Sequence, residues 1–362
     1  MAIQTPSRAP FRDRSTVTSA PLVNPPLPGW APLAALATGA LLSYALTLFF
    51  GGFSLVPFIL FFVVSTTATI TIASRVKEGP RKSLDRFVTC IVISAFGLAM
   101  VPLFSLIYEV LSRGLHRLDG EFFGSSMTGI LGEGGGAYHA ILGTLIITLI
   151  TTAISVPIGL MCAIYLVEYG HGRLSKAITF LVDVMTGIPS IVAGLFAFAL
   201  FSLFFGPGVR LGIAGAVALS VLMIPVVVRS TEEILKLVPN ELREAAYALG
   251  VPKWRTIVKI VLPTSAAGLA TGVTLAIARV IGETAPLLVT VGITTGTNLN
   301  PFDGRMATLP VFSYYAYTQP GIPPAFSIDR AWTAALVLIA LVMLLNLVAR
   351  FISRLFAPKT GR

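Results

Sequence analysis

Long apolar stretches alternate with short polar ones along most of the chain. A membrane-spanning helix needs roughly 20 consecutive, mostly apolar residues. Stretches of about this length lie at about 31–50, 53–73, 87–109, 140–167, 177–205, 211–229, 265–292 and 331–352. The first two are joined by little more than Gly51 and Gly52, which predicts a tight helical hairpin. The whole pattern predicts an all-α, polytopic membrane protein with about eight transmembrane helices.

Composition supports a membrane protein and narrows the chemistry. Of the 362 residues, 55% are hydrophobic and only 12% are charged, whereas soluble domains carry about 25% charged residues. Cys90 and Cys162 lie in separate apolar stretches, and the three histidines are scattered without the spacing of metal ligands. We therefore expect neither a disulfide framework nor a metal site.

Topology explains the net charge of +10. With eight spans, twenty lysines and arginines fall on the side of the N-terminus, and five fall on the opposite side, at Arg113, Arg117, Arg210, Arg305 and Arg330. Because lysine and arginine accumulate on the cytoplasmic side of membrane proteins, both termini are expected to be cytoplasmic, in the plasma or inner membrane. Residues 230–263 then lie in the cytosol. Residues 1–29, which contain the proline-rich PLVNPPLPG, are expected to form a disordered cytoplasmic tail.

The cytosolic stretch NELREAAYALGVPKWRTIVKIVLP (240–263) predicts two short amphipathic helices. Ser230 and Glu233 have the spacing of a capping box that starts a helical turn, and Asn240 is suited to cap the first helix. Gly250 suits the left-handed residue that ends a helix. Apolar residues at helical spacing follow at Leu242, Ala245, Ala246 and Leu249, then at Trp254, Ile257, Val258 and Val261.

Pro252 suits the first turn of the second helix, and Pro263 is expected to end it. We call residues 240–263, which contain the two helices and the turn between them, the elbow. Its apolar stripe has two interpretations. The helices lie on lipid headgroups, or the small alanines let a partner protein approach closely. Spacing alone leaves both open.

Charged residues inside the predicted spans are costly and usually functional. Arg279 and Glu283 are four residues apart in the seventh span, which places them on one helical face. Arg229 ends the sixth span, with Glu232 three residues on. For Arg279 and Glu283, one interpretation is an ion pair that fixes helix packing. The other is an anion site or gate, because the fork of arginine suits a tetrahedral oxyanion.

A carboxylate beside the arginine would add selectivity. Phosphate keeps a proton near neutral pH and sulfate does not, so Glu283 or Glu232 would accept a hydrogen bond from phosphate and repel sulfate. Asp183, early in the fifth span, is expected to be structural, and Arg229 is equally suited to anchor the span at the membrane interface.

The elbow resembles the EAA signature of importer-type ABC permeases. The matching residues are Glu244, Ala245, Ala246, Gly250, Ile260, Leu262 and Pro263. In that family the loop is a coupling helix that sits in a groove of a cytosolic ATPase subunit. The resemblance therefore favours partner docking over a helix pair that lies on lipid.

Four further stretches resemble the PstA family of phosphate ABC transporter permeases. They are GTLIITLITTAISVPIGLMCAIYLVEYG (143–170), DVMTGIPSIVAGLF (183–196), PVVVRSTEEILKLVPNELREAAYALG (225–250) and AIARVIGETAPLL (276–288). The resemblance implies that Arg229, Glu232, Arg279 and Glu283 match charged positions of phosphate translocation. It also implies three kinds of partner: a homologous, PstC-like permease, two PstB-like ATPases and an extracytoplasmic, PstS-like phosphate-binding protein.

The resemblance also implies how the chain is divided. A type I importer permease domain with a core of five spans is expected at 138–352. An additional span at 87–110 and an extra hairpin at 30–75 precede it, and a short cytoplasmic tail at 353–362 follows. The family usually has six spans, so the hairpin is the departure.

Other classes explain less of the sequence. The GxxxxGK[ST] phosphate loop of an ATPase does not occur, and no catalytic arrangement of serine, cysteine and histidine stands out. We therefore expect a transport subunit that binds no cofactor and depends on the ATP of its partner. A secondary transporter is the alternative class, but it needs no coupling helix. Molybdate, sulfate and phosphonate are the alternative substrates.

Overall fold

The computed structural model describes residues 25–50 and 52–356. The predictions made for residues 1–24 and 357–362 lie outside these described residues. Every regular element in the described part of the chain is a helix, as predicted. Among the described residues, seven helices are long and apolar enough to cross a membrane, and one bent helix pair brings the number to eight if it counts as a span.

The chain divides into two compact units, with the boundary after Leu106. The first unit contains α1 (Ala31–Phe49), α2 (Leu55–Lys77) and most of α3 (Pro80–Gly114). α1 and α2 form the predicted hairpin. They approach closely at Gly39, where an added Cβ would lie 2.0 Å from Thr66 Oγ1, and Ser43 and Ser65 share a hydrogen bond of 3.2 Å.

Glu78 holds the polar end of this unit together. Its carboxylate accepts hydrogen bonds from Arg86 Nε (2.7 Å) and Ser74 Oγ (2.7 Å) and from the Leu27 backbone N–H (2.8 Å). Hydrogen bonds to the charged form, led by that from Arg86, hold the pKa of Glu78 well below its ordinary value. The turn between α2 and α3 is thus tied to the segment that enters α1.

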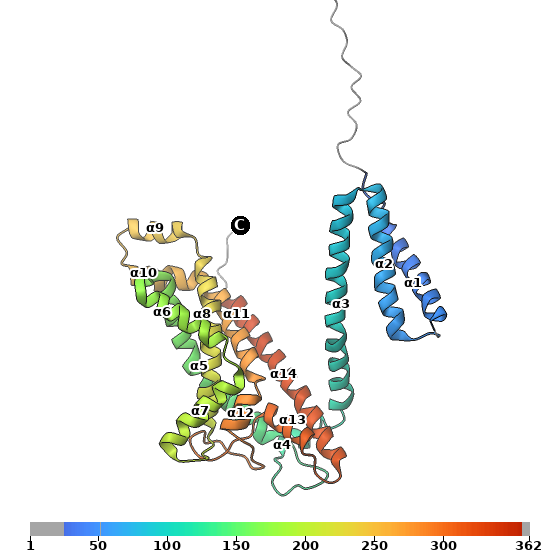
Figure 1. The fold of residues 1–362 in the computed structure, drawn as a ribbon. Coiled ribbons are helices and arrows are strands. Elements are labelled where there is room, and N and C mark those ends of the chain that lie inside the picture. The colour runs from blue at the N-terminus through green and yellow to red at the C-terminus, as the bar shows by residue number, and fades with distance from the viewer. Residues whose placement is uncertain (1–24, 51, 357–362) are drawn as a thin grey trace, which may run out of the picture. The chain divides into compact units, whose positions relative to one another are not determined.

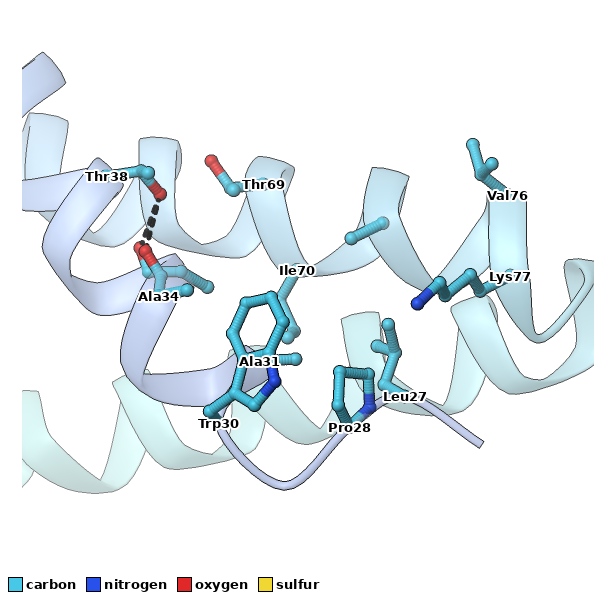
Figure 2. Close-up of a pocket in the computed structure, with 12 residues that line it drawn as sticks. Leu27, Pro28, Trp30, Ala31, Ala34, Thr38, Thr69, Ile70, Val76 and Lys77 are labelled. Carbon is cyan, nitrogen blue, oxygen red and sulfur yellow. Dashed lines mark hydrogen bonds between the residues drawn. The ribbon is translucent and has the colours of Figure 1, made fainter. Parts of the chain in front are cut away.

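A pocket of about 410 Å³ lies between α1 and α2. Figure 2 shows that apolar side chains such as Trp30 and Ile70 line it, and that Lys77 extends its amino group toward the end formed by Leu27 and Pro28. Of the other polar lining residues, Thr38 donates its hydroxyl proton to the carbonyl of Ala34 on its own helix. The pocket is therefore an apolar groove and not a path for anions.

The second unit is a helical bundle (Figure 1). Its elements are α4 (Gly120–Gly124), α5 (Tyr138–Ile164), η1 (Tyr165–Tyr169), α6 (Gly172–Thr186), α7 (Ser190–Phe205), α8 (Gly212–Lys236), α9 (Asn240–Ala248), α10 (Lys253–Thr256), η2 (Ile257–Val261), α11 (Leu262–Ile281), α12 (Ala285–Thr290), α13 (Leu309–Thr318) and α14 (Pro324–Phe356). Figure 1 shows α9 at one end of the unit, which we call the elbow end, and α4, α12 and α13 at the other, which we call the α12 end.

α8 lies at the centre of the bundle, with α5 and α11 packed along it. Buried apolar residues such as Leu219, Met223 and Val227 face the core from α8. Small residues let α11 approach closely, because an added Cβ at Gly268 or Gly272 would meet Ile234 at 2.7 Å and Ser230 at 2.9 Å. Close packing through small residues is typical of membrane helices.

The predicted span at 177–205 is broken in the structure. α6 and α7 are separated at Gly187–Pro189 and bent by 106°. Proline has no N–H for a helix ladder and disfavours helical backbone in the residue before it. The two helices form a broken span or a re-entrant loop.

The predicted span at 265–292 is also broken. α11 ends at Ile281, and Gly282, Glu283 and Thr284 separate it from α12, whose first turn contains Pro286. The sequence had predicted that Arg279 and Glu283 share one helical face. This prediction is wrong, because α11 ends between them.

Two predicted helix boundaries around the elbow are wrong. Ser230 does not begin a helix, because α8 runs on to Lys236 and the Ser230 hydroxyl donates to the carbonyl of Val227 (3.2 Å). Pro263 does not end one, because it lies in the first turn of α11, which continues directly from the π-helical turn η2. Proline has no N–H to donate to the helix ladder, and it is tolerated there because the π turn lies directly before it.

Candidate functional site

The elbow turns at Gly250, as predicted. Its φ of 73° is in the left-handed region that suits glycine. The N–H groups of Gly250 and Val251 close the end of α9 by donating to the carbonyls of Tyr247 (2.9 Å) and Ala246 (3.1 Å). Asn240 does not cap α9. It is the first residue of the helix after Pro239, and its side chain accepts from Arg243.

Arg243 fastens the elbow to the bundle. Its Nε and Nη2 donate to Glu168 Oε1 at 3.1 and 3.0 Å, joining α9 to η1 at the end of α5. It also donates to the carbonyls of Leu235 (3.0 Å) and Val238 (2.6 Å), where α8 ends. The side chains of Arg243 and Glu168 are only 12% and 4% exposed. This one arginine thus connects the elbow to both α5 and α8.

A second contact ties the elbow to η1. The Lys253 ammonium at the start of α10 lies 4.8 Å from the centroid of the Tyr169 ring, a cation–π contact. Ala246, Ile257 and Val261 face the bundle and are buried. The elbow is therefore held by contacts along its whole length.

The other half of the predicted apolar stripe is uncovered. Leu249 is 83% exposed, Trp254 58% and Val258 54%. Glu244 and Ala245 of the signature are also exposed. Within the described residues, Glu244 takes part in no ion pair. The outer face of the elbow is therefore an apolar and acidic surface that no described residue covers.

The remaining signature residues do not project from the elbow as one group. Ile260 and Leu262 are half-buried, and Pro263 is exposed at the start of α11. Leu262 packs beside buried Leu235 and Val261. These positions connect the elbow to the membrane helix that follows.

Arg229 is surrounded by carboxylates. Its Nη1 donates to Glu232 Oε2 at 2.8 Å, and its Nη2 donates to Asp183 Oδ1 on α6. Lys236 Nζ completes the cluster at 2.6 Å from Glu232 Oε1. Two cations and two carboxylates balance, so this cluster, as it stands, clamps α6 to α8 and has no free positive charge for an anion.

Arg279 has a different environment. It is exposed near the end of α11, and among the described residues its guanidinium forms neither an ion pair nor a hydrogen bond. Glu283 is half-buried beyond the end of the helix. Gly272 lies level with Ser230 on α8, so Arg279 lies seven residues, about 10 Å along the helix axis, beyond the level of Arg229. The structure does not bring the four predicted path residues together.

The pair formed by Arg243 and Glu168 was missed by the sequence analysis. Glu168 is the single charged residue near the end of the apolar stretch CAIYLVEYG. An isolated acid at the end of an apolar stretch is the sequence signal that could have identified Glu168 as functional. Its partner lies 75 residues away, and no local spacing predicts that contact.

A bundle of membrane helices that carries an elbow between α8 and α11 is the fold of a known class of membrane protein. Residues 155–362 match the family described as "Binding-protein-dependent transport system inner membrane component". A solved bacterial alginate ABC transporter in complex with an alginate-bound periplasmic protein shares the fold, with a TM-score of 0.54 and 14% identity over 77% of this chain and 97% of that chain. The class is the inner-membrane permeases of binding-protein-dependent transport systems.

Sequence relatives narrow the class. The chain is 46% identical to phosphate transport system permease protein PstA 1 of Mycobacterium tuberculosis over 75% of this chain and 89% of the relative. It is 36% identical to PstA of Yersinia pestis over 81% of this chain and 96% of the relative. The chain therefore belongs to the PstA family of phosphate transport permeases. It is a subunit of a membrane transport system, and its family membership implies association with other ABC transporter components.

Proposed function

We propose that the chain forms the membrane path for inorganic phosphate in an ATP-driven importer, paired with a homologous, PstC-like permease. Two PstB-like ATPases bind at the elbow end, and a PstS-like protein delivers phosphate at the α12 end. Both termini and the elbow are cytosolic. The chain binds no cofactor of its own, and ATP is hydrolysed by the partner ATPases.

The observation that carries this proposal is the elbow. Its outer face offers exposed apolar residues and an unpaired Glu244, while Arg243 connects it to α5 and α8. A force applied to the outer face therefore reaches two membrane helices directly. Such a joint suits rocking of a helical bundle between inward and outward access.

The exposed position of Arg279 supports pairing with a second permease. A charged side chain within a span faces a bundle interior or a water-filled cavity, because contact with lipid is costly. Arg279 is exposed in the single chain, so a second permease is needed to enclose it. The space between the two subunits is then the anion path.

Along this path, Arg279 supplies the free cation and Glu283 the hydrogen-bond acceptor that distinguishes protonated phosphate from sulfate. Arg229 and Glu232 act at a second level, nearer the elbow. Their cluster with Asp183 is the closed state of a gate, and movement of α6 away from α8 would free the guanidinium for phosphate.

Uptake by the reconstituted complex tests these roles. Glu244→Ala is expected to abolish uptake of labelled phosphate, whereas Glu241→Ala, an exposed acid on the same helix but outside the signature, retains it. Arg279→Gln should lose uptake, and Arg279→Lys should keep part of it. Wild-type uptake by Arg279→Gln in a stable complex would show that the anion role is wrong.

A further inference from the structure

Five arginines belong to the side that the charge pattern predicts to be outward, and three of them have partners. Arg113 pairs with Glu109. Arg117 pairs with Asp119 (3.3 Å) and Glu121 (3.4 Å). Arg330 donates to the carbonyls of Gly132 and Gly134. Within the described residues, the side chains of the other two, Arg210 and Arg305, form no ion pair and no hydrogen bond.

These two arginines come together at Gly292, which follows α12. A Cβ added to Gly292 would lie 3.0 Å from Arg210 Cδ and 3.2 Å from its Nη1, and 3.5 Å from Arg305 Cδ. Both side chains thus pass the same Cα atom. Gly292 also has a φ of 73°, so glycine is favoured there both by its backbone and by the approach of the arginines.

Backbone hydrogen bonds fix the segments that carry the two arginines. Leu211 N–H, next to Arg210, donates to the carbonyl of Thr290 (3.1 Å), and Ile213 N–H donates to that of Pro301 (2.8 Å). Asn298 Nδ2 donates to the carbonyl of Arg305 itself (3.0 Å). The backbone that carries both arginines is therefore held in place at the α12 end.

Within the described residues, no carboxylate forms an ion pair with either arginine, so no ion pair compensates their two positive charges. Like charges close together repel, and Asp303, two residues from Arg305, forms no ion pair within the described residues. The arginines do not cap α12 either, because backbone N–H groups occupy the carbonyls of Leu287 and Thr290. Because both side chains pass Gly292, their two guanidinium forks can converge on one tetrahedral dianion, whose charge and shape they match.

We propose that Arg210 and Arg305 form a binding site for tetrahedral oxyanions at the α12 end, which receives phosphate before it reaches Arg279. The direction of travel rests on the proposed function, but the binding itself does not. α12 connects Gly292 to Glu283, and its six residues span about 9 Å. The two charged levels are thus one short helix apart.

The site selects for charge and shape but not for phosphate. Arginine carries only hydrogen-bond donors, so the pair binds sulfate and phosphate alike. Discrimination needs an acceptor such as Glu283 farther along the path.

The test is protection of single arginines from chemical modification in the purified full-length chain. An arginine-specific dicarbonyl reagent is applied with phosphate, sulfate or chloride at matched ionic strength, and mass spectrometry quantifies each arginine. Phosphate and sulfate should slow modification of Arg210 and Arg305 by a factor of 1 + [L]/Kd, about twofold where concentration equals Kd. Exposed Arg75 is the control, and its rate should depend on ionic strength alone.

Equal rates in phosphate and chloride at Arg210 and Arg305 would overturn the proposal. Uptake provides an independent arm, in which Arg210→Gln with Arg305→Gln lowers the rate severalfold at low phosphate and Arg210→Lys with Arg305→Lys restores it. Wild-type uptake by the glutamine double variant would also overturn the proposal. Failure of the wild-type complex to import phosphate would contradict the proposed function instead, and protection would still decide the anion site.

Discussion

Replacing Arg243 with methionine should loosen the elbow without unfolding the bundle. Methionine keeps much of the apolar stem but removes every hydrogen bond to Glu168, Leu235 and Val238. Because the Glu168 side chain is only 4% exposed, its carboxylate would be left buried without its partner. Breaking a buried pair in this way costs about 3–5 kcal/mol. At about 1.4 kcal/mol per tenfold, the detached elbow becomes about a hundredfold to a few thousandfold more populated.

Hydrogen exchange of the purified complex measures this population directly. Backbone amides of α9 and α10 should exchange faster in Arg243→Met, while those of α5 and α8 in the core change little. Arg255→Met is the matched control, because Arg255 carries the same charge on the same elbow but only lies over the Trp254 ring at 5.3 Å. In vesicles, the complex that contains Arg243→Met should still hydrolyse ATP through its ATPase subunits while it imports little substrate.

A double variant makes the reasoning refutable. If Arg243 and Glu168 act as one unit, adding Glu168→Gln to Arg243→Met should recover part of the loss, because glutamine removes the unpaired buried charge. Additive effects of the two changes, or elbow amides that exchange at the wild-type rate in Arg243→Met, would show that this pair does not hold the elbow.

Three further predictions concern packing and charge. Gly272→Val should destabilise the purified complex by about 1–3 kcal/mol, measured by thermal unfolding, and Ser230→Gly should recover part of the loss because Ser230 is the residue that the new side chain meets. Glu78 has a depressed pKa, so its contribution to folding stability is present above the ordinary carboxyl value of 4.5 and is lost as the pH falls below it. The stability difference between wild type and Glu78→Gln should therefore be largest near neutral pH and shrink in acid. A difference that stays constant with pH would contradict this role of Glu78. Asp183→Asn should cost less than about 1 kcal/mol because Asp183 is 59% exposed, whereas Glu232→Gln, at 13% exposed and bound to both Arg229 and Lys236, should lower the melting temperature more.

Local patterns in the sequence predicted the features that depend on neighbouring residues. Apolar length located the helices, and the turn at Gly250 followed from its place between two amphipathic stretches. Helical spacing placed Arg229 and Glu232 on the same side of one helix, where the structure pairs them. The breaks before Ser190 and Ala285 were predictable in principle from Pro189 and Pro286, but apolar length alone concealed them.

Contacts between residues far apart in the sequence could not be predicted from local patterns. Asp183 reaches Arg229 only because α6 packs against α8, and Glu168 reaches Arg243 only because α9 folds back on η1. The arginine pair at Gly292 depends on three segments that meet at the α12 end. In each case the residue types were visible in the sequence, and the fold supplied the partner.

Uptake of labelled phosphate into vesicles that contain the reconstituted complex tests the central claim most directly. Sulfate or molybdate is added in excess over phosphate but at micromolar concentration. Weak binding of about 4 kcal/mol corresponds to a millimolar Kd, so it does not compete at this concentration. The account predicts uptake that requires ATP and resists both competitors. Uptake without ATP would contradict an importer driven by a partner ATPase, and uptake abolished by sulfate or molybdate would contradict phosphate as the substrate.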